Sequence, residues 1–340
     1  MKTLVCQKPG ELVIEQRENP TELPEGHALI AVSHVGICGT DYHIFEGKHP
    51  FLNYPRVMGH EMSGRILKAD PLAAHKVGDA VIINPYLTCG KCHACMRGKP
   101  NCCAAISVLG VHQDGAMCEE ILVPSENLYS AQGLSLRDAA TVEFLAIGAH
   151  AVRRSNGGEK DKVLVIGAGP IGIGTALFAR LKGQRVTLLD SDANRLDSVS
   201  SRFGFDSKIL LNADISAKID EITAGNGFDI VYDATGNAKS MQAAFGFVSY
   251  GGTLIFVSVV KDIINFSDPE FHKREMTLVG SRNATREDFE TVIDAIRAGK
   301  ILIDLLVTHT TTMDDAPANL ARWAHEKAGL IKAIIVVGGR

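Results

Sequence analysis

The sequence predicts an α/β protein of two domains, one β-rich and one built on a doubly wound parallel sheet. The chain has 340 residues, which is more than one hydrophobic core usually serves. From Lys162 onward, apolar runs alternate with helical patterns, and this alternation indicates parallel strands covered by helices on both faces. Before that point, short strand-like runs such as Leu12–Ile14 and Ala28–Val32 are separated by turns, which indicates a β-rich domain.

The composition narrows the class of protein. Hydrophobic residues make up 46% of the chain and charged residues 22%, as in an ordinary globular protein. The formal net charge of −4 gives no electrostatic reason to expect binding to nucleic acid or to an anionic membrane. The first residues lack the apolar core of a signal peptide, so we expect a cytoplasmic protein.

The expected domain of alternating strands and helices starts with a glycine motif, G-A-G-P-I-G, between an apolar strand and a helical pattern. Gly167 permits a tight turn, Gly169 lets the backbone approach a pyrophosphate, and Gly172 lets the helix pack on the strand. The next strand ends in Asp190, 18 residues beyond Gly172 (190 − 172), where an acid would bind the ribose hydroxyls of NAD. The alternative is a plain glycine-rich turn. The combination of strand, helix, second strand and terminal acid favours a dinucleotide site.

Further elements follow from the apolar pattern. We expect one helix over 136–146, another near 286–298 and a closing strand at 331–337. Asp233–Gly236 and Val257–Val259 fall at strand ends, where a doubly wound sheet forms its ligand crevice. The strands expected in the parallel sheet are 163–167, 185–190, 207–211, 228–233, 252–258 and 276–280.

Five of the eight cysteines lie in one short segment, and four of them, Cys89, Cys92, Cys95 and Cys103, have the spacing C-x2-C-x2-C-x7-C. Four thiolates from one compact lobe suit a closed, tetrahedral zinc site that stabilises its loop. An iron–sulfur cluster also uses four cysteines, and a disulfide lobe is a further alternative that fits a cytoplasmic protein poorly. Cys102 is adjacent to Cys103, so the spacing leaves the fourth ligand open.

A second set of possible metal ligands lies on separate loops. Cys38 follows one strand, and His60 and Glu61 follow a glycine shortly after it. Zinc prefers sulfur and imidazole ligands, and a catalytic zinc keeps one position open. Glu143 lies among apolar residues, where a buried carboxylate needs a partner or a metal, unless it faces a solvent-filled cleft. Isolated residues of these types are more often structural.

Together these motifs resemble the zinc-dependent medium-chain alcohol dehydrogenase family. G-I-C-G-T-D-Y-H at 36–43, G-H-E-M-S-G at 59–64, the four-cysteine lobe and the glycine motif at 167–172 occur in the order of that family, over essentially the whole chain. The resemblance implies a discontinuous GroES-like catalytic zinc domain over 1–147 and 286–340. It also implies a Rossmann NAD-binding domain over 148–285, with the active site in the cleft between the two.

The resemblance also implies roles for individual residues. Cys38 and His60 match ligands of a catalytic zinc, with Glu61 and Glu143 as carboxylates of the same site, and which carboxylate binds zinc directly stays open. The four cysteines match the ligands of a structural zinc. With the catalytic zinc, the resemblance therefore implies two zinc ions per chain. Thr40 and His43 match a proton relay. The residues expected to contact NAD are Gly167, Gly169, Pro170, Ile171, Gly172, Asp190, Arg195, Thr235, Val257, Ser258, Val259, Ser281 and Arg282.

Within that family the segments 266–273, 280–285 and 110–115 look most like sugar-acid dehydrogenases that oxidise an aldonate such as galactonate or gulonate. The resemblance implies hydride transfer from a secondary alcohol of a sugar acid or polyol to NAD. Lys273, Arg274 and Arg282 can supply a cation for the carboxylate, although a solvated charged face explains the first two equally well.

Several alternatives stay open. One is an L-threonine or sorbitol-type dehydrogenase of the same family. Others are a zinc-free reductase of the superfamily and a non-enzymatic NAD-binding protein. The expected partners are a small-molecule alcohol and further copies of the same chain, as a homotetramer or a homodimer, with no nucleic acid and no membrane.

Overall fold

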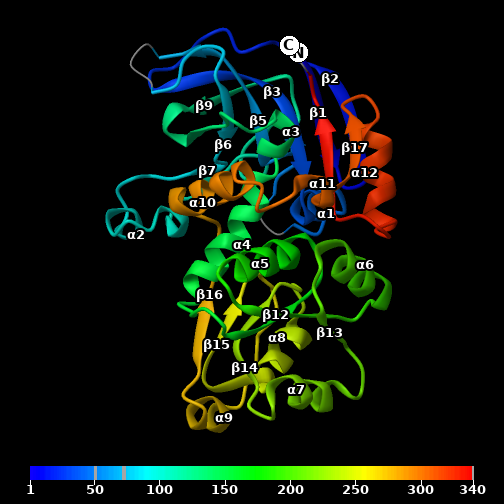
Figure 1. Cartoon of the computed structure of the whole chain (residues 1–340). Coiled ribbons are helices and arrows are strands. Elements are labelled where there is room, and N and C mark those ends of the chain that lie inside the picture. Colours follow the sequence, from blue (N-terminus) through cyan, green and yellow to red (C-terminus); the bar gives the residue numbers. More distant parts are fainter. Residues whose placement is uncertain (50–51, 71–73, 339–340) are drawn as a thin grey trace. The chain divides into compact units, whose positions relative to one another are not determined.

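The computed structural model describes residues 1–49, 52–70 and 74–338, and the chain forms two compact units (Figure 1). The first unit comprises Met1–Glu143 and Ile293–Arg340, and the second comprises Phe144–Val292. The first is rich in antiparallel strands and the second contains a parallel sheet. The predicted combination of a β-rich part and a doubly wound part is confirmed.

The first unit is organised around the long strand β3 (His27–Ile37). This strand pairs antiparallel with β5 (Glu61–Ala69), β9 (Glu120–Pro124) and β18 (Lys332–Val336). Gly36 of β3 lies opposite Glu61 of β5, so the loops that follow β3 and precede β5 meet at one end of the sheet. The other strands of this unit are β1 (Lys2–Lys8), β2 (Glu11–Gln16), β4 (Arg56–Val57), β6 (Ala80–Ile83), β7 (Tyr86–Leu87), β8 (Ser107–Val108), β10 (Leu128–Ser130) and β17 (Val307–Thr312).

An apolar cluster fills the interior of the first unit. Leu4, Ile30, Met58 and Ile66 are at most 1% exposed, and the helix α1 (Gly39–Phe45) packs on this cluster through Ile44. Burial of such side chains stabilises each by about 1.5–3 kcal/mol relative to exposure. Other helical segments of this unit are α2 (His93–Met96), α3 (Leu136–Ala139), α11 (Ile303–Leu306), α12 (Ala316–His325) and the 3₁₀ turns Pro100–Cys102 and Ser125–Asn127.

The second unit contains a parallel sheet with the order β13-β12-β11-β14-β15-β16, in which the order of strand addition reverses between β11 and β14. Its strands are β11 (Lys162–Ile166), β12 (Arg185–Asp190), β13 (Ser207–Leu210), β14 (Phe228–Asp233), β15 (Val248–Phe256) and β16 (Thr277–Gly280). Its helices are α5 (Pro170–Leu181), α6 (Ala193–Phe203), α7 (Ile215–Thr223), α8 (Ala238–Ala244), α9 (Asp268–Lys273), the 3₁₀ turn Phe245–Phe247 and α10 (Arg286–Arg297), which extends past this unit's boundary. The predicted strands are confirmed to within a residue or two, except that β15 begins earlier than predicted.

The early start of β15 has a local cause. Val248 pairs with Phe228, and the register then shifts before Ile230 pairs with Thr253. Gly251, with φ of +74°, lies inside this irregularity. A glycine in an apolar run often indicates the end of a strand. Here Gly251 lies in an irregularity of the pairing, and the strand continues on both sides of it.

The prediction of one helix over 136–146 is wrong, because the segment forms α3 and then α4 (Val142–Arg154). The backbone N–H and the hydroxyl of Thr141 both donate to the carbonyl of Asp138, at 3.0 and 2.7 Å. A hydroxyl that bonds the backbone competes with the helical ladder. The chain therefore turns before α4, which places Glu143 in the first turn of that helix.

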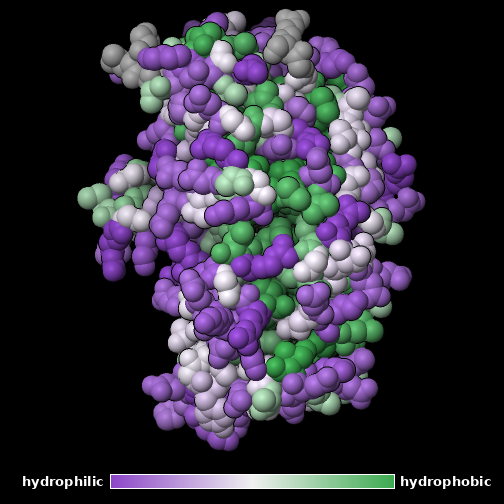
Figure 2. Space-filling model, viewed as in Figure 1, coloured by the Kyte–Doolittle hydropathy of each residue, from purple (hydrophilic) through white to green (hydrophobic). Residues whose placement is uncertain are grey.

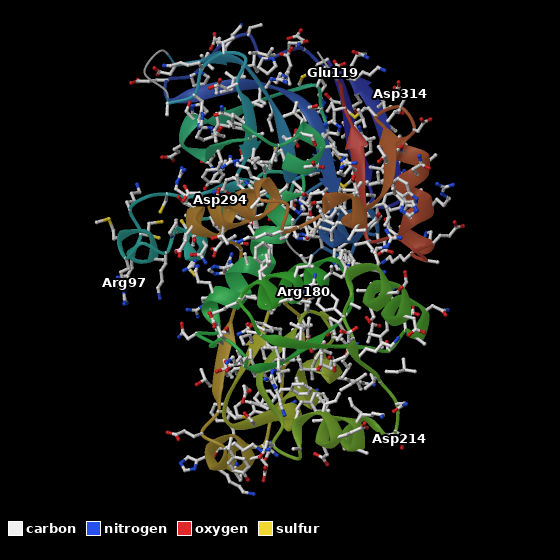
Figure 3. All side chains as sticks on the ribbon, viewed as in Figure 1. Arg97, Glu119, Arg180, Asp214, Asp294 and Asp314 are labelled. Carbon is white, nitrogen blue, oxygen red and sulfur yellow. The ribbon has the colours of Figure 1, made fainter. Side chains whose placement is uncertain are left out.

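Hydrophilic side chains cover much of the face drawn in Figure 2. Charged residues such as Asp214 and Asp294, labelled in Figure 3, are exposed. Within the described ranges, no helix has both the length and the apolar composition that crossing a bilayer requires.

Candidate metal and dinucleotide sites

The first unit brings three possible metal ligands together. One donor atom each from Cys38, His60 and Glu61 lies within 4.8 Å of the others. Cys38 precedes α1, whereas His60 and Glu61 lie where the chain enters β5. The pairing of β3 with β5 therefore brings Cys38 to His60 and Glu61, which lie more than 20 residues further along the chain.

A buried acid ties the two loops together. Asp41 accepts hydrogen bonds from the backbone N–H groups of Cys38, at 2.8 Å, and Gly59, at 3.2 Å. Its Oδ1 lies 3.9 Å from Nδ1 of His60. Burial raises the pKa of Asp41, and the charge of His60 and the Cys38 N–H oppose that shift. The loop before His60 requires glycine, because Gly59 has φ of +93° and a Cβ there would lie 2.8 Å from Val35.

Glu61 is held by a lysine from the far end of the chain. Lys332 Nζ donates to both carboxylate oxygens of Glu61 at 2.8 Å and to the carbonyl of Ile37 at 3.1 Å. Both side chains are at most 1% exposed. Burial alone lowers the pKa of Lys332, but the charge of Glu61 outweighs it and the pKa is raised. Gly36 makes room for this pair, since a Cβ there would lie 2.2 Å from the Glu61 carboxylate.

Glu143 lies near the cluster without belonging to the group of three. It is buried and accepts a hydrogen bond from the Tyr86 hydroxyl. Burial raises the pKa of Glu143 to about 7; the charge of His60 opposes this shift and the charge of Glu61 reinforces it. Such crowding of buried acids favours a bound cation.

The residues present fit a zinc ion. Sulfur, imidazole nitrogen and carboxylate oxygen are the ligands that zinc takes in proteins. In addition, the buried Nδ1 of His60 has no hydrogen-bond partner among the described residues. With Glu143 nearby as a further carboxylate, the set can hold zinc through three or four protein ligands.

The two predicted relay residues lie three positions apart on α1, and so on one side of that helix. Thr40 is half-buried, and its Oγ1 lies 3.9 Å from Cys38 Sγ. His43 is exposed. Partial desolvation of its ring lowers the pKa of His43, the charge of Glu46 opposes this shift, and the charge of Lys327 adds to it. A neutral imidazole at the surface can accept a proton and release it to water.

The four cysteines predicted to share a metal converge in one lobe, whose surface carries Arg97 (Figure 3). Sγ of Cys92 lies 3.5 Å from that of Cys95 and 3.9 Å from that of Cys103, and Cys103 lies 3.5 Å from Cys89. All four cysteines are free, and a disulfide would need about 2 Å. A tetrahedral site with Zn–S bonds of about 2.3 Å needs sulfurs roughly 3.8 Å apart, so the geometry fits zinc. Cys102 is exposed and lies outside this group.

In the second unit the glycine motif has the geometry that a pyrophosphate site needs. Gly167 has φ of +97°, and a Cβ on Gly172 would lie 1.7 Å from the Gly167 carbonyl oxygen. A Cβ on Gly169 would meet nothing within 4 Å, which leaves open space above the start of α5, where Pro170 and Ile171 form the first turn. Free N–H groups at this helix terminus can receive an anion.

Asp190, at the end of β12, is held beside this motif. Its Oδ2 accepts from Ala168 N at 2.7 Å, and its Oδ1 accepts from Asp192 N at 2.9 Å. Arg195 Nη1 lies 3.9 Å from Oδ2. The carboxylate is thereby fixed next to the glycine turn, in the position from which an acid reaches ribose hydroxyls.

The remaining predicted cofactor residues lie beyond the carboxyl ends of three strands. Thr235 follows β14, and its hydroxyl donates to Asp233 at 2.7 Å. Val257, Ser258 and Val259 follow β15, and Ser281 and Arg282 follow β16. Ligands of doubly wound sheets bind outside this edge.

The structure contradicts part of the prediction for a substrate carboxylate. Arg274 Nη1 donates to the carbonyl of Val248, at the amino end of β15, and its guanidinium lies 5.5 Å from the Tyr250 ring centroid. Lys273 is its neighbour and lies 3.9 Å from Glu270. Both cations therefore lie at the edge of the sheet opposite the ligand crevice, where they contact residues of the second unit. Arg282 alone of the three lies at the carboxyl edge.

Comparison with known proteins follows this geometry. The family model of the alcohol dehydrogenase GroES-like domain matches residues 24–133, and that of the zinc-binding dehydrogenase matches residues 170–298. L-galactonate-5-dehydrogenase of Escherichia coli K12 is 42% identical over 337 residues, which is 98% of either chain. This chain belongs to the zinc-dependent medium-chain alcohol dehydrogenase family.

Other relatives agree. Sorbitol dehydrogenase 1 of Saccharomyces cerevisiae is 30% identical over 331 residues, 92% of this chain and 91% of that one. The solved structure of an alcohol dehydrogenase (rspB) from E. coli CFT073, complexed with NADH, has a TM-score of 0.92, 28% identity and 99% coverage of both chains. The dehydrogenase described here is therefore an oxidoreductase of a family that uses zinc and a nicotinamide dinucleotide.

Three residues that contact or surround the candidate metal site were not predicted from the sequence. Lys332 is one of them, although a lone lysine in an apolar closing strand signals a buried acidic partner. Asp41 lies in the motif at 36–43, from which only Cys38, Thr40 and His43 were assigned roles. Nothing in the sequence around Tyr86 indicates a role for it. Each is recognised only through a contact with a residue elsewhere in the chain. Lys332 contacts Glu61, Asp41 contacts Gly59, and Tyr86 contacts Glu143.

Proposed function

We propose that this dehydrogenase oxidises a secondary hydroxyl group of a sugar acid and transfers the hydride to NAD. The cluster of Cys38, His60 and Glu61 carries the proposal, because sulfur, imidazole and carboxylate donors within 4.8 Å suit a catalytic zinc. The 42% identity to L-galactonate-5-dehydrogenase supports an aldonate as the substrate class. A polyol is the second candidate, supported by the sorbitol dehydrogenase relative.

In this proposal the discontinuous segment 1–147 with 286–340 is the catalytic zinc domain, and 148–285 binds NAD. Cys38 and His60 hold the catalytic zinc with Glu61 or Glu143, and the four-cysteine lobe holds a structural zinc. When bound, zinc supplies a Lewis acid that acidifies the substrate hydroxyl, and NAD supplies the hydride acceptor. The Thr40 hydroxyl, which can accept the substrate proton while donating its own, would begin a proton relay that ends at His43 and solvent. Asp41 orients the loops of Cys38 and His60 through its two backbone hydrogen bonds.

In the same proposal, the pyrophosphate of NAD binds at the turn formed by Gly167, Gly169, Pro170, Ile171 and Gly172. Asp190 and Arg195 contact the adenosine ribose. The nicotinamide half of the cofactor lies along the strand ends marked by Thr235, Val257, Ser258, Val259, Ser281 and Arg282. The support is the position of these residues at the carboxyl edge of the sheet.

Replacing Asp190 by alanine is expected to weaken NAD binding and to narrow the preference for NAD over NADP. The reason is that a fixed carboxylate accepts hydrogen bonds from the ribose hydroxyls and repels a 2′-phosphate. We expect kcat/KM for NAD to fall by about tenfold or more, which corresponds to roughly 1.4 kcal/mol. Comparison of kcat/KM for the two cofactors checks this expectation. Asp197→Ala is the matched control, because Asp197 is an exposed acid on α6. An unchanged preference in Asp190→Ala would count against the ribose role.

A substrate panel tests the proposed function. The purified protein is assayed with NAD and with aldonates, including L-galactonate and L-gulonate, with polyols, including sorbitol, and with L-threonine. We expect the largest kcat/KM with an aldonate. Oxidation of sorbitol alone would replace the sugar acid by a polyol. Absence of turnover in the whole panel would refute both candidates.

We further propose that the dehydrogenase is a cytoplasmic homo-oligomer, either a dimer or a tetramer. All eight cysteines are free, which suits a reducing compartment. In the described residues, β16 pairs only with β15, and its Leu278 is 39% exposed, so a strand edge is available to a second copy. Light scattering of the purified protein gives the mass that decides between monomer, dimer and tetramer.

A further inference from the structure

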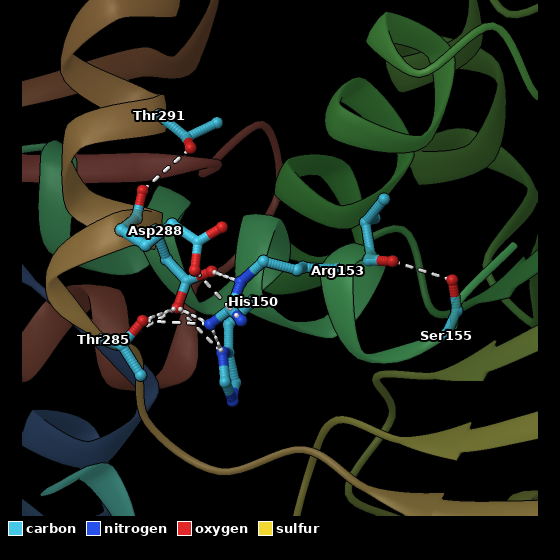
Figure 4. A network of polar contacts seen from close by, with 8 residues as sticks. His150, Arg153, Ser155, Thr285, Asp288 and Thr291 are labelled. Carbon is cyan, nitrogen blue, oxygen red and sulfur yellow. Dashed lines mark hydrogen bonds and ion pairs between the residues drawn. The ribbon is translucent and has the colours of Figure 1, made fainter. Parts of the chain in front are cut away.

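A buried polar network lies in the second unit (Figure 4), whereas both groups of possible metal ligands belong to the first. Asp288 is 1% exposed and forms its centre. Arg153 donates to it through Nε at 2.7 Å and Nη2 at 2.9 Å, and His150 Nδ1 lies 2.8 Å away. The backbone N–H and the hydroxyl of Thr285 also donate to it, both at 2.8 Å. One carboxylate thus receives hydrogen bonds from two elements besides its own helix.

The network joins α4 to a loop. His150 and Arg153 are three residues apart on one face of α4, and Asp288 lies in the first turn of α10. Thr285 ends the loop Ser281–Thr285, which begins where β16 ends. Arg153 Nη2 also donates directly to the Thr285 hydroxyl at 2.9 Å. The end of this loop is therefore fastened to α4 by side chains from both neighbouring helices.

The hydrogen bonds of this network also affect the pKa of Asp288. Burial by itself raises the pKa of that carboxyl, but hydrogen bonds from His150 and Arg153 and from the Thr285 N–H outweigh burial and hold the pKa well below its usual range. The carboxylate is therefore ionised at neutral pH. An ionised carboxylate only accepts hydrogen bonds, so its contact with His150 is a hydrogen bond in the form of the ring that carries a proton on Nδ1.

The position of the loop relates it to one half of the cofactor. A doubly wound sheet consists of two halves, each of which binds one mononucleotide. Asp190 ends β12 and serves the adenosine half, so the nicotinamide half belongs to the side of β14, β15 and β16. The loop Ser281–Thr285 extends from the carboxyl end of β16, on that second side. Asn283 within it has φ of +53°, a conformation that side chains rarely adopt unless their surroundings fix it.

We propose that His150, Arg153, Asp288 and Thr285 are positioning residues that fix the loop Ser281–Thr285 for the nicotinamide half of the cofactor. This inference rests on the proposed NAD-dependent function. The network belongs to the second unit and both groups of possible metal ligands to the first, so we infer that it acts on the cofactor through the loop. A loosened loop must be ordered again each time nicotinamide binds, which lowers affinity for that half of the dinucleotide and leaves the adenosine half unchanged.

Two ligands separate this role from a general loss of structure. NADH carries the nicotinamide, whereas ADP-ribose contains the same adenosine, pyrophosphate and second ribose without it. The Kd of each ligand is measured for the full-length enzyme and for Asp288→Asn, Thr285→Val and Thr285→Ser. The matched control is Glu287→Gln, because Glu287 is 67% exposed and pairs with Arg153 Nη1 at 3.2 Å outside the buried network.

We expect Asp288→Asn and Thr285→Val to weaken NADH binding by about tenfold, with ADP-ribose affected less than about twofold. Thr285→Ser keeps the hydroxyl and should bind NADH as the native enzyme does, and so should Glu287→Gln. If both ligands weaken together, or if neither changes, the positioning role is refuted. Thr285→Val decides the matter if Asp288→Asn fails to fold. Failure of the native enzyme to bind NADH or ADP-ribose would instead refute the proposed function itself.

Discussion

Cys38→Ser and His60→Ala are each expected to lower kcat by more than about 10³-fold, which corresponds to at least roughly 4 kcal/mol of transition-state stabilisation. Each change removes a soft or nitrogen donor from a cluster whose three donor atoms lie within 4.8 Å of one another. Binding of NADH should stay nearly intact, because the glycine motif and Asp190 belong to the other unit. Steady-state turnover and NADH titration give the two quantities.

Cys102→Ser is the matched control for these variants. Cys102 is exposed and takes no part in either metal cluster of the described residues, so its replacement should leave turnover unchanged. Near-normal turnover in Cys38→Ser or in His60→Ala would show that the assignment of the catalytic metal is wrong. Loss of NADH binding in the same variants would show that they unfold, and in that case a metal titration replaces the kinetic assay.

Lys332→Met is expected to lower the free energy of unfolding by about 3–5 kcal/mol, because it leaves the buried carboxylate of Glu61 without its partner. The two oxygens of Glu61 each lie 2.8 Å from Lys332 Nζ, and water cannot replace that cation where both side chains are at most 1% exposed. Urea denaturation of the variant and the native protein measures the difference.

The double variant Lys332→Met with Glu61→Gln provides the control. Removal of both charges should recover a large part of the stability, since a neutral amide costs less to bury than an unpaired carboxylate. The interaction free energy from this double-mutant cycle should then be at least about 1 kcal/mol. A loss below about 1 kcal/mol in Lys332→Met, together with no coupling, would contradict the buried ion pair.

The parts of the fold and site that follow from sequence are those in which the determining residues are close together. The glycine motif, Asp190 and the four-cysteine lobe each occupy a short segment, and their chemistry depends on spacing that can be counted. The strands β11, β12 and β14 each end in a run of four buried residues, and their positions were predictable to within a residue.

The parts that do not follow depend on contacts between distant residues or on one side chain that overrides a pattern. Glu61 and Lys332 are 271 positions apart, and His150 and Asp288 are 138 apart, so no local pattern predicts either pair. Thr141 divides a predicted helix through one hydroxyl hydrogen bond. Arg274 belongs to the amino edge of the sheet, which becomes clear only when Val248 is seen to begin β15 early.

Zinc content per chain tests the central claim most directly, namely that a catalytic zinc is held by Cys38 and His60 in addition to the structural zinc of the four-cysteine lobe. Elemental analysis of the purified protein, with protein concentration from amino-acid analysis, gives this number. The account predicts two zinc ions per chain, falling to one in Cys38→Ser. One zinc ion in the native protein, with no change in Cys38→Ser, would leave only the lobe occupied and would contradict the account.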